Sequence, residues 1–442
     1  MKRCGFVLFL LGLSLIFTSA SGAADLKISG EFMAGGMYLN GTTVKKDVAD
    51  EGPSTAFYFQ RLRVRTDIVV SPGLTLITRF DAMERAWGAA RSTPDPALDT
   101  ASAGTRAENE NIAFDWAYVE YVSPVGMFRV GYMNDNAWGT VFANGGTPKG
   151  KIAWSYIQGP WYVTLQIVKM LNDNSYTAKN NTATASDADN DKYVAAVKYS
   201  WKGGEAGLLS AVGRDATNRP AGNNKALYYA LMPYAIAQVG PVKIQAEVDY
   251  FWGKWQEFET SATDIKMNAL AAWVDVTADF NKAYVGGSIA YVSGDDPGTT
   301  DKLESNTTLI NGGRDWNPCL ILFNFDRTYW AGNIGGYDSS VNGGPMTNAW
   351  FFQGRAGVRP VDKVDIMASA SYANADKKPS AAWLYNDYGY EVDLTATYKI
   401  TNNLSYMLGA GYLFTGKYYK GVSDINAVAN NYLVVNKLTL TF

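Results

Sequence analysis

Histidine is absent from this chain of 442 residues, and cysteine occurs only twice, as Cys4 and Cys319. Without histidine, the sequence lacks the commonest protein metal ligand and both the Ser-His and the Cys-His nucleophile pairs. It also lacks the Cys-x-x-Cys-His motif that attaches c-type haem. We therefore predict no catalytic site, no metal site and no cofactor.

Long apolar runs are also lacking, with one exception near the first residue. There, a basic start is followed by the apolar run from Gly5 to Phe17 and by the small-residue stretch "TSASGAAD". This order is typical of a secretory signal peptide, which we place at residues 1–24. Its removal would take Cys4 away and leave Cys319 alone, so the remaining chain could form no internal disulfide. No later stretch reaches the ~18 to 20 apolar residues of a membrane helix.

Glycine and tyrosine are plentiful, with 43 and 28 residues, and they lie in short segments of alternating polarity. In residues 242–250, every second side chain from Val242 to Tyr250 is apolar. The other parity carries Lys243, Gln245, Glu247 and Asp249. Residues 60–68 and 391–399 repeat this pattern. A period of two predicts strands whose two faces meet different environments.

The connections between these segments alternate in length. Eight are tight and rich in Pro, Gly and Asn, which supply turn geometry. Nine mostly longer polar connections lie between them, so that the seventeen connections join eighteen strands. Aromatic residues near the tight turns, among them Phe128, Trp161 and Tyr284, predict an interfacial girdle.

This asymmetry is typical of a transmembrane barrel with short periplasmic turns and long extracellular loops. We therefore predict an all-β fold, in which residues 25–442 form one antiparallel transmembrane β-barrel of about 18 strands. The alternative is a secreted β-sandwich, whose connections would have no reason to alternate in length.

Three stretches carry a resemblance to a known family. They are "FQRLRVRTDIVVSPGLTLITRFDAMERAWG" at 59–88, "GYEVDLTATYKITNNLSYMLGAGYLFTG" at 389–416 and "NYLVVNKLTLTF" at 431–442. The chain resembles a Gram-negative outer-membrane porin and, more narrowly, the major porins of metal-reducing bacteria. The resemblance implies a place in the cell outer membrane. It also implies that Phe442, with Leu440 and Leu438, belongs to the signal read by the barrel-assembly machinery.

The pattern and the resemblance together predict a water-filled channel for passive diffusion of small hydrophilic solutes or ions. We predict no enzyme, because the familiar barrel enzymes of this membrane rely on histidine. The expected partners are outer-membrane lipid, the assembly machinery and the solutes, with no nucleic acid, and a monomer and a homotrimer both stay open. The alternative function is a structural barrel or sheath that supports electron-transfer cytochromes at the cell surface.

Charged residues on the polar parity are candidates for lining the pore. Lipid exposure of arginine at the bilayer midplane would cost about 2–4 kcal/mol, so we expect these side chains to face the lumen. The basic strands carry Arg61, Arg63, Arg65, Arg79, Asp81 and Arg85, and opposing carboxylates are expected at Glu247, Asp249, Asp365, Glu391 and Asp393. One interpretation is a transverse field that biases ion selectivity. The other is that the charges pair and brace the wall.

The connection at 294–345 is far longer than ordinary loops, which suggests a function. It carries seven acidic and three basic residues, and its middle, "CLILFNFDRTYW", is strongly apolar. We therefore predict that it folds into or over the barrel mouth and narrows it. The alternative is an outer cap that packs on neighbouring loops or subunits.

Overall fold

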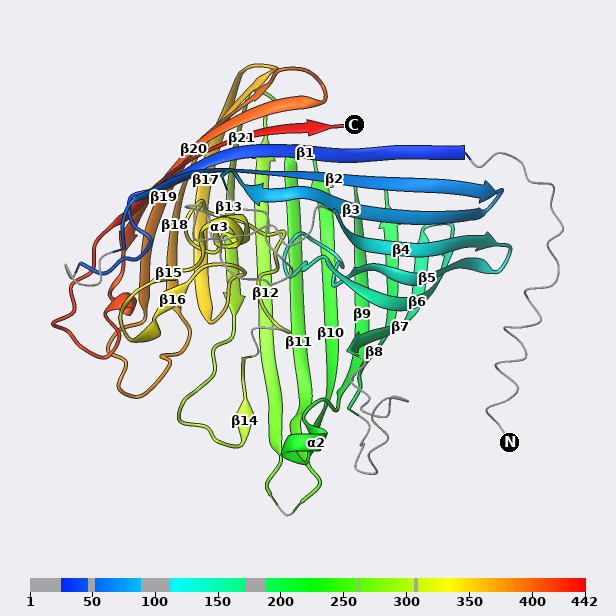
Figure 1. Ribbon diagram of the computed structural model, residues 1–442, viewed down its shortest axis with the longest axis horizontal. Coiled ribbons are helices and arrows are strands. Elements are labelled where there is room, and N and C mark those ends of the chain that lie inside the picture. The colour runs from blue at the N-terminus through cyan, green and yellow to red at the C-terminus, as the bar shows by residue number, and fades with distance from the viewer. Residues whose placement is uncertain (1–24, 47–51, 89–111, 172–187, 261, 306–308) are drawn as a thin grey trace.

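The computed structural model describes residues 25–46, 52–88, 112–171, 188–260, 262–305 and 309–442. Its main feature is a closed antiparallel barrel of eighteen strands (Figure 1), which confirms the predicted fold class. The predicted signal peptide, residues 1–24, lies outside the described part of the chain.

The barrel strands follow one another in chain order. They are β1 (Asp25–Leu39), β2 (Thr55–Ser71), β3 (Leu74–Ala86), β4 (Ile112–Ser123), β5 (Gly126–Asp135), β6 (Thr147–Gln158), β7 (Trp161–Leu171), β8 (Asn190–Trp201), β9 (Gly204–Asp215), β10 (Asn224–Val239), β11 (Val242–Phe258), β12 (Ile265–Asp279), β13 (Ala283–Val292), β17 (Ala349–Val361), β18 (Val364–Ala375), β19 (Asp387–Lys399), β20 (Leu404–Thr415) and β21 (Asn431–Thr441). Each pairs with the next barrel strand in sequence.

The ring closes where β21 pairs with β1, with Thr441 opposite Glu31. Just beyond this register, the amide of Gly30 donates to the carbonyl of Phe442 at 2.8 Å, and the amide of Phe442 donates back to Gly30 at 3.0 Å. From Gly30 to Leu39, closure therefore pairs the backbone groups that an open sheet edge would leave free, which would be costly in lipid.

The connections have the two lengths that the sequence predicts. All eight tight connections are turns of two to four residues, and they lie at one end of the barrel. Gly73 and Gly159 occupy two of them at φ values of 80° and 58°, a conformation that favours glycine. The longest connection at the other end joins β13 to β17 and covers residues 293–348.

Short elements lie within the longer connections. They are α2 (Arg219–Gly222), β14 (Lys302–Leu303), α3 (Phe325–Ala331), β15 (Ile334–Gly335), η2 (Tyr337–Ser339), β16 (Val341–Asn342) and η3 (Lys417–Lys420). β14 pairs in parallel with β12, and β15 pairs with β16. In the described ranges, no helix has the length and apolar character needed to traverse a bilayer.

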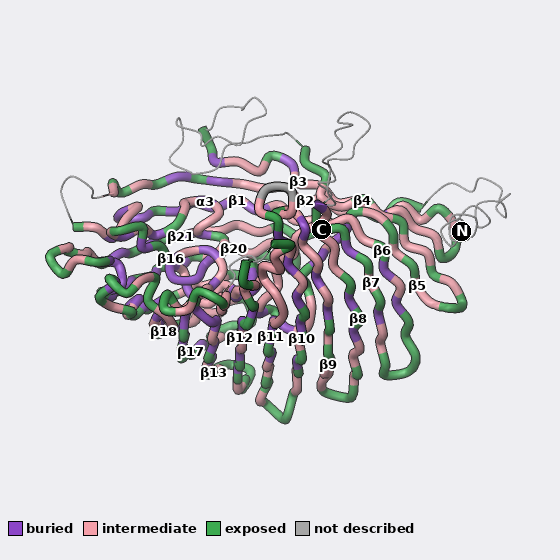
Figure 2. Tube along the Cα trace, turned by 90° about the horizontal axis from the view of Figure 1, so that it is seen from below, coloured by how far each residue is buried: buried purple, intermediate pink, exposed green. Residues whose placement is uncertain are grey.

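Burial alternates along the barrel strands (Figure 2). On β11, Val248 and Tyr250 are exposed, whereas Glu247 and Asp249 are buried. Because successive side chains of a strand point to opposite faces, the exposed apolar set forms the outer face and the polar set lines the lumen. An apolar outside with a polar inside is the distribution that a barrel in lipid requires.

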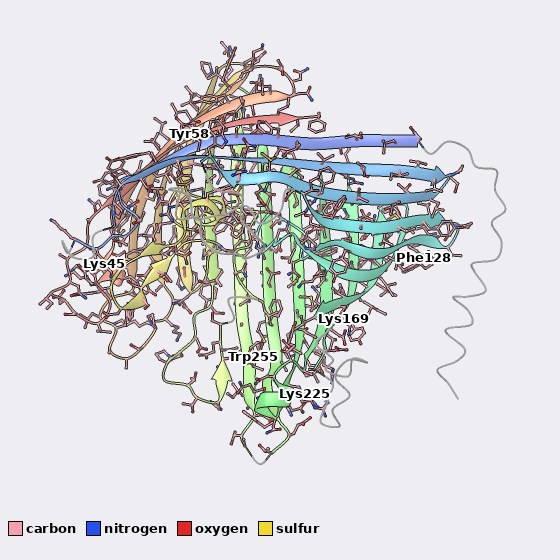
Figure 3. All side chains as sticks on the ribbon, viewed as in Figure 1. Lys45, Tyr58, Phe128, Lys169, Lys225 and Trp255 are labelled. Carbon is pink, nitrogen blue, oxygen red and sulfur yellow. The ribbon has the colours of Figure 1, made fainter. Side chains whose placement is uncertain are left out.

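Aromatic side chains gather on the outside near the tight turns. Figure 3 labels Phe128 at this end, and Lys225 and Trp255 near α2 at the end with the longer connections. Tyr284, which the sequence assigns to the same girdle, points inward instead, and its hydroxyl donates to Asp365 at 2.8 Å. Its parity is opposite to that of the exposed outer residues of β13, so the expectation for this tyrosine is wrong.

The main apolar cluster lies inside the barrel, between the wall and the connections at 136–146 and 293–348. Phe142 stacks on Trp273 of β12 with ring centroids 5.9 Å apart. Trp316 meets Phe351 of β17 edge to face at 5.4 Å. Two connections are therefore packed against the inner wall by apolar contacts.

Candidate functional site

The predicted arginine row lies on β2 and faces the lumen. Arg63 is opposite Asp81 in the β2–β3 register, and two of its guanidinium nitrogens donate to the two carboxylate oxygens at 2.7 Å each. Arg65 makes a similar two-point contact with Asp67 of its own strand, at 2.7 and 3.0 Å. Two-point contacts fix the plane of a guanidinium as well as its position.

Arg61 of β2 and Arg85 of β3 also lie beside polar residues of neighbouring strands. Arg61 donates to Glu31 of β1 at 3.4 Å and lies 3.7 Å from a carboxylate oxygen of Glu84. Arg85 is opposite Gln60 in the β2–β3 register.

Arg79 has both an ionic and an aromatic partner on β4. Its guanidinium donates to Asp115, and its Cζ lies 3.6 Å from the ring centroid of Trp116. A guanidinium over an aromatic face gains electrostatic attraction from the ring. The β2–β4 wall therefore holds its positive charges in fixed orientations.

Further ion pairs continue this arrangement around the lumen, and the sequence analysis did not single them out. They are Arg129 with Glu120 at 2.8 Å, Lys198 with Glu205 at 2.9 Å and Arg355 with Asp275 at 2.7 Å. The signal that could have found them is opposite charge on the inward parity of nearby strands. Among the described residues, the β2 arginines form no ion pair with the predicted carboxylates of β11, β18 or β19.

Two predicted carboxylates stand on β11. Glu247 accepts hydrogen bonds from the amide and the hydroxyl of Thr140, at 2.7 and 2.5 Å, and so holds the β5–β6 connection inside the barrel. Asp249 is 1% exposed, and neither of its carboxylate oxygens has a hydrogen-bond partner within the described ranges.

Asp365 lies elsewhere, at the tight-turn end of β18. It accepts from the hydroxyl of Tyr284 and, at 2.9 Å, from the guanidinium of Arg359. Arg359 also contacts Asp279 at 2.9 Å, so this group ties the ends of β12, β17 and β18 together.

Glu391 of β19 anchors the longest connection. It is fully buried, and its two carboxylate oxygens accept from the amides of Ile321 and Leu322 at 2.6 and 2.7 Å. Asp393, two residues further on the same face, contacts the hydroxyl of Ser369 at 3.4 Å. The apolar middle of the 293–348 connection is thus held against the inner wall.

The two infolded connections also bind each other. The amide of Ala143 donates to Gly312 at 3.0 Å, and the amide of Arg314 donates to Asn144 at 2.7 Å. Phe142 meets Trp316 edge to face at 5.2 Å. Because each connection also contacts the inner wall of the barrel, the two connections form one packed assembly inside it.

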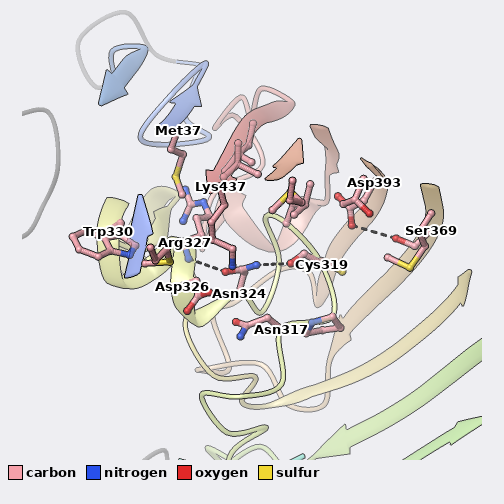
Figure 4. A pocket seen from close by; sticks show the side chains of 18 of the residues that line it. Met37, Asn317, Cys319, Asn324, Asp326, Arg327, Trp330, Ser369, Asp393 and Lys437 are labelled. Carbon is pink, nitrogen blue, oxygen red and sulfur yellow. Dashed lines mark hydrogen bonds between the residues drawn. The ribbon is translucent and has the colours of Figure 1, made fainter. Parts of the chain in front are cut away.

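A cavity of about 230 Å³ remains between this assembly and the wall (Figure 4). Apolar side chains such as Met37 and Phe59 line it together with Arg327 of α3 and Lys437 of β21. Arg327 is 2% exposed and donates to the carbonyl of Gly332 at 2.8 Å. Burial lowers the pKa of Arg327 to about 10, because the charged form loses hydration.

Cys319 lies at the edge of the same cavity and is a free, buried thiol. Its sulfur contacts the hydroxyl of Ser371 at 3.3 Å. Burial, with the nearby carboxylates of Glu391 and Asp393, raises the pKa of the Cys319 thiol well above its usual value.

A closed barrel with an apolar outer face, a charged lumen and infolded connections defines the class: the fold is that of the outer-membrane porins. No protein-family model and no curated protein matches the sequence.

Solved porin structures do match the fold over nearly the whole chain. OpdK from Pseudomonas aeruginosa, solved with vanillate, is 12% identical, with 94% of this chain and 98% of OpdK covered and a TM-score of 0.50. OccK8 (OprE) from the same organism is 10% identical, with 95% and 98% covered and a TM-score of 0.52. A BenF-like porin from Pseudomonas fluorescens is 11% identical, with 95% and 100% covered and a TM-score of 0.51. The comparison therefore supports the porin architecture and leaves the solute open.

Proposed function

We propose that this protein is an outer-membrane channel for passive diffusion of small hydrophilic solutes or ions. The observation that carries the proposal is the lumen wall, where charged side chains are held in fixed pairs inside a closed barrel whose outer face is apolar. Such a wall is costly against lipid but suits a hydrated path. By the usual orientation of this class, the tight turns face the periplasm and the longer connections face outward.

The 293–348 connection is the proposed filter of this channel. Its anchor, Glu391, sits on the inner face of β19, and Trp330 of α3 stacks on Phe59 of β2 with ring centroids 4.6 Å apart. Trp316 of the same connection also meets Trp273 of β12, with ring centroids 6.5 Å apart. The connection therefore touches the wall from β12 to β2 and narrows the cross-section along that arc. OpdK, which has this architecture, was solved with vanillate, and this supports passage of a small organic solute here.

The arginines of β2 have a narrower proposed role in ion selection. Pairing with nearby carboxylates cancels much of their long-range field, but it leaves fixed local dipoles along the wall. The narrower resemblance to porins of metal-reducing bacteria, the assembly role of Phe442 and the choice between monomer and trimer stay predictions.

Planar-bilayer recording of the purified barrel tests the channel. We expect stepwise ohmic conductance, with a reversal potential in asymmetric salt that changes when Arg61, Arg63 and Arg65 are replaced by Ala. Absence of conductance under all conditions would overturn the channel, and stable co-purification with cytochromes would then favour the sheath. Unchanged selectivity in the triple variant would reject only the role of the arginines.

A further inference from the structure

Three buried side chains with metal-binding atoms converge beside the cavity. Cys319 comes from the infolded connection, while Glu391 and Asp393 come from β19. One ligand atom from each lies within 4.8 Å of the others. The residues are 3%, 0% and 3% exposed, respectively, so the group is almost fully removed from bulk water.

One oxygen of this group binds no donor group in the described part of the chain. Asp393 Oδ1 is buried there without a hydrogen bond and lies near the Glu391 carboxyl group, so the two acidic side chains need either a shared proton or a cation between them. The backbone of β20 lies close to both carboxylates, because a Cβ at Gly411 would lie 2.6 Å from Asp393 Oδ1, 3.1 Å from Leu320 Cβ and 3.4 Å from Glu391 Oε1. Glycine at this position therefore lets the two carboxylates and Leu320 pack together against β20.

The negative charge of the two carboxylates is not neutralised by a direct ion pair with a described basic residue. Arg327 and Lys437 line the same cavity, yet within the described chain neither forms an ion pair with Glu391 or Asp393. The amides of Ile321 and Leu322 bind the two oxygens of Glu391. Each of these oxygens retains a second lone pair, so a ligand can still bind there.

We propose that Cys319, Glu391 and Asp393 bind one divalent cation of the Zn²⁺ type. One sulfur and two carboxylate oxygens suit Zn²⁺, which accepts both ligand types, better than Ca²⁺ or Mg²⁺, which take oxygen. Tetrahedral bonds of about 2.3 Å to sulfur and about 2.0 Å to oxygen place the ligand atoms roughly 3.3–3.5 Å apart. In the structure these atoms lie within 4.8 Å of one another, so cation binding would draw them together by up to about 1.5 Å. Cys319 and Asp393 line the cavity, from which water would supply a fourth ligand.

A cation at this site would fix the 293–348 connection to the barrel wall, a role separate from solute passage. Cys319 belongs to the connection that narrows the barrel, and its two partners belong to the wall. A bound cation would therefore staple the connection to β19 at a second point, two residues from the bonds that hold Ile321. No metal site is predicted from the sequence, because Cys319 lies more than 70 residues before the two carboxylates and the group includes no histidine.

Metal analysis of the assembled barrel tests the site. After chelation and dialysis, we expect the protein to take up one equivalent of Zn²⁺. With Co²⁺ in place of Zn²⁺, we expect a cobalt–thiolate charge-transfer band. Cys319→Ser should abolish the band, and Asp393→Asn should weaken cation binding at least tenfold. Glu205→Gln, which changes a lumen carboxylate outside the group, should leave both unchanged.

Two readouts keep the proposal falsifiable if a variant fails to fold. Absence of stoichiometric uptake, or of the cobalt–thiolate band, in the wild-type barrel would overturn the site without any substitution. If the folded Cys319→Ser and Asp393→Asn variants bind the cation as tightly as the wild type, the assignment of the ligands is overturned. Bilayer conductance reports the channel separately, since a barrel without this cation would still conduct.

Discussion

Replacing Glu391 by Gln should release the middle of the 293–348 connection while the barrel stays folded. Both oxygens of Glu391 accept from backbone amides, at 2.6 Å from Ile321 and 2.7 Å from Leu322. Glutamine keeps the size of the side chain but offers one acceptor oxygen and one donor nitrogen. That nitrogen would face an amide N–H, so one buried donor would lose its partner.

The magnitude follows from these two contacts. Leaving a buried N–H unpaired costs about 1–3 kcal/mol, and loss of the charge weakens the second bond by about 1 kcal/mol. The total of about 2–4 kcal/mol corresponds to a roughly 30- to 700-fold larger population of the released connection, at about 1.4 kcal/mol for each factor of ten. The barrel strands keep their pairing, because the lost bonds are not part of the sheet ladder.

Single-channel recording measures this effect. We expect larger or noisier conductance in Glu391→Gln, with unchanged mobility of the folded barrel on semi-native gels. Chelator in all samples separates the hydrogen-bond effect from any cation. The matched control is Glu205→Gln, which also removes a lumen carboxylate, but whose hydrogen-bond partners in the described chain, Lys198 and Tyr234, lie outside the 293–348 connection. Conductance and noise equal to those of wild type, in a folded variant, would refute the anchoring role of Glu391.

Three further predictions concern other parts of the chain. Burial opposes ionisation of Glu304, but Lys302, at 2.7 Å, and the amide of Asp296 outweigh it and lower the pKa of Glu304 below its ordinary value of 4.5. The ionised Glu304 carboxylate therefore stabilises the folded connection fully above pH 4.5, and this stabilisation is lost as the pH falls through the lower pKa of Glu304 in the folded protein. Protease cleavage near residues 295–304 should rise in acid for the wild type and be independent of pH for Glu304→Gln. Arg63→Ala should shift the reversal potential toward cations and Asp81→Asn toward anions, each with a stability loss of about 1 kcal/mol, and identical shifts would contradict the paired wall. Deleting Phe442 should lower the yield of heat-modifiable barrel more than it changes conductance, because it removes two seam hydrogen bonds; normal assembly would exclude this role.

Strand count and strand boundaries were accessible from the sequence because they depend on local patterns. The alternation in β11 places Val248 outward and Glu247 inward wherever that strand lies in the barrel. Tight turns are similarly local, since Gly73 and Gly159 mark them by their own backbone freedom. Tyr284 was wrongly assigned to the outer aromatic girdle, because its nearness to a tight turn does not fix the face to which it points; its position on the strand places it on the inner face.

The partners of the lumen charges were not accessible, because they depend on register between strands. The sequence places Arg63 and Asp81 on one face but does not fix how far β2 and β3 slide, and a shift of one residue would change every pair. Arg65 illustrates the consequence. It lies opposite Arg79, and its carboxylate partner is Asp67 on its own strand.

The sequence by itself determined a closed barrel with an apolar outside and a charged inside, because period and turn chemistry are encoded within a few neighbouring residues. Only the tertiary structure decided what occupies the lumen. Glu391 binds Ile321 across 70 positions of the chain, and the same fold brings Cys319 to the two carboxylates of β19. Such contacts arise only when the barrel closes around the connection, since nothing local draws these residues together.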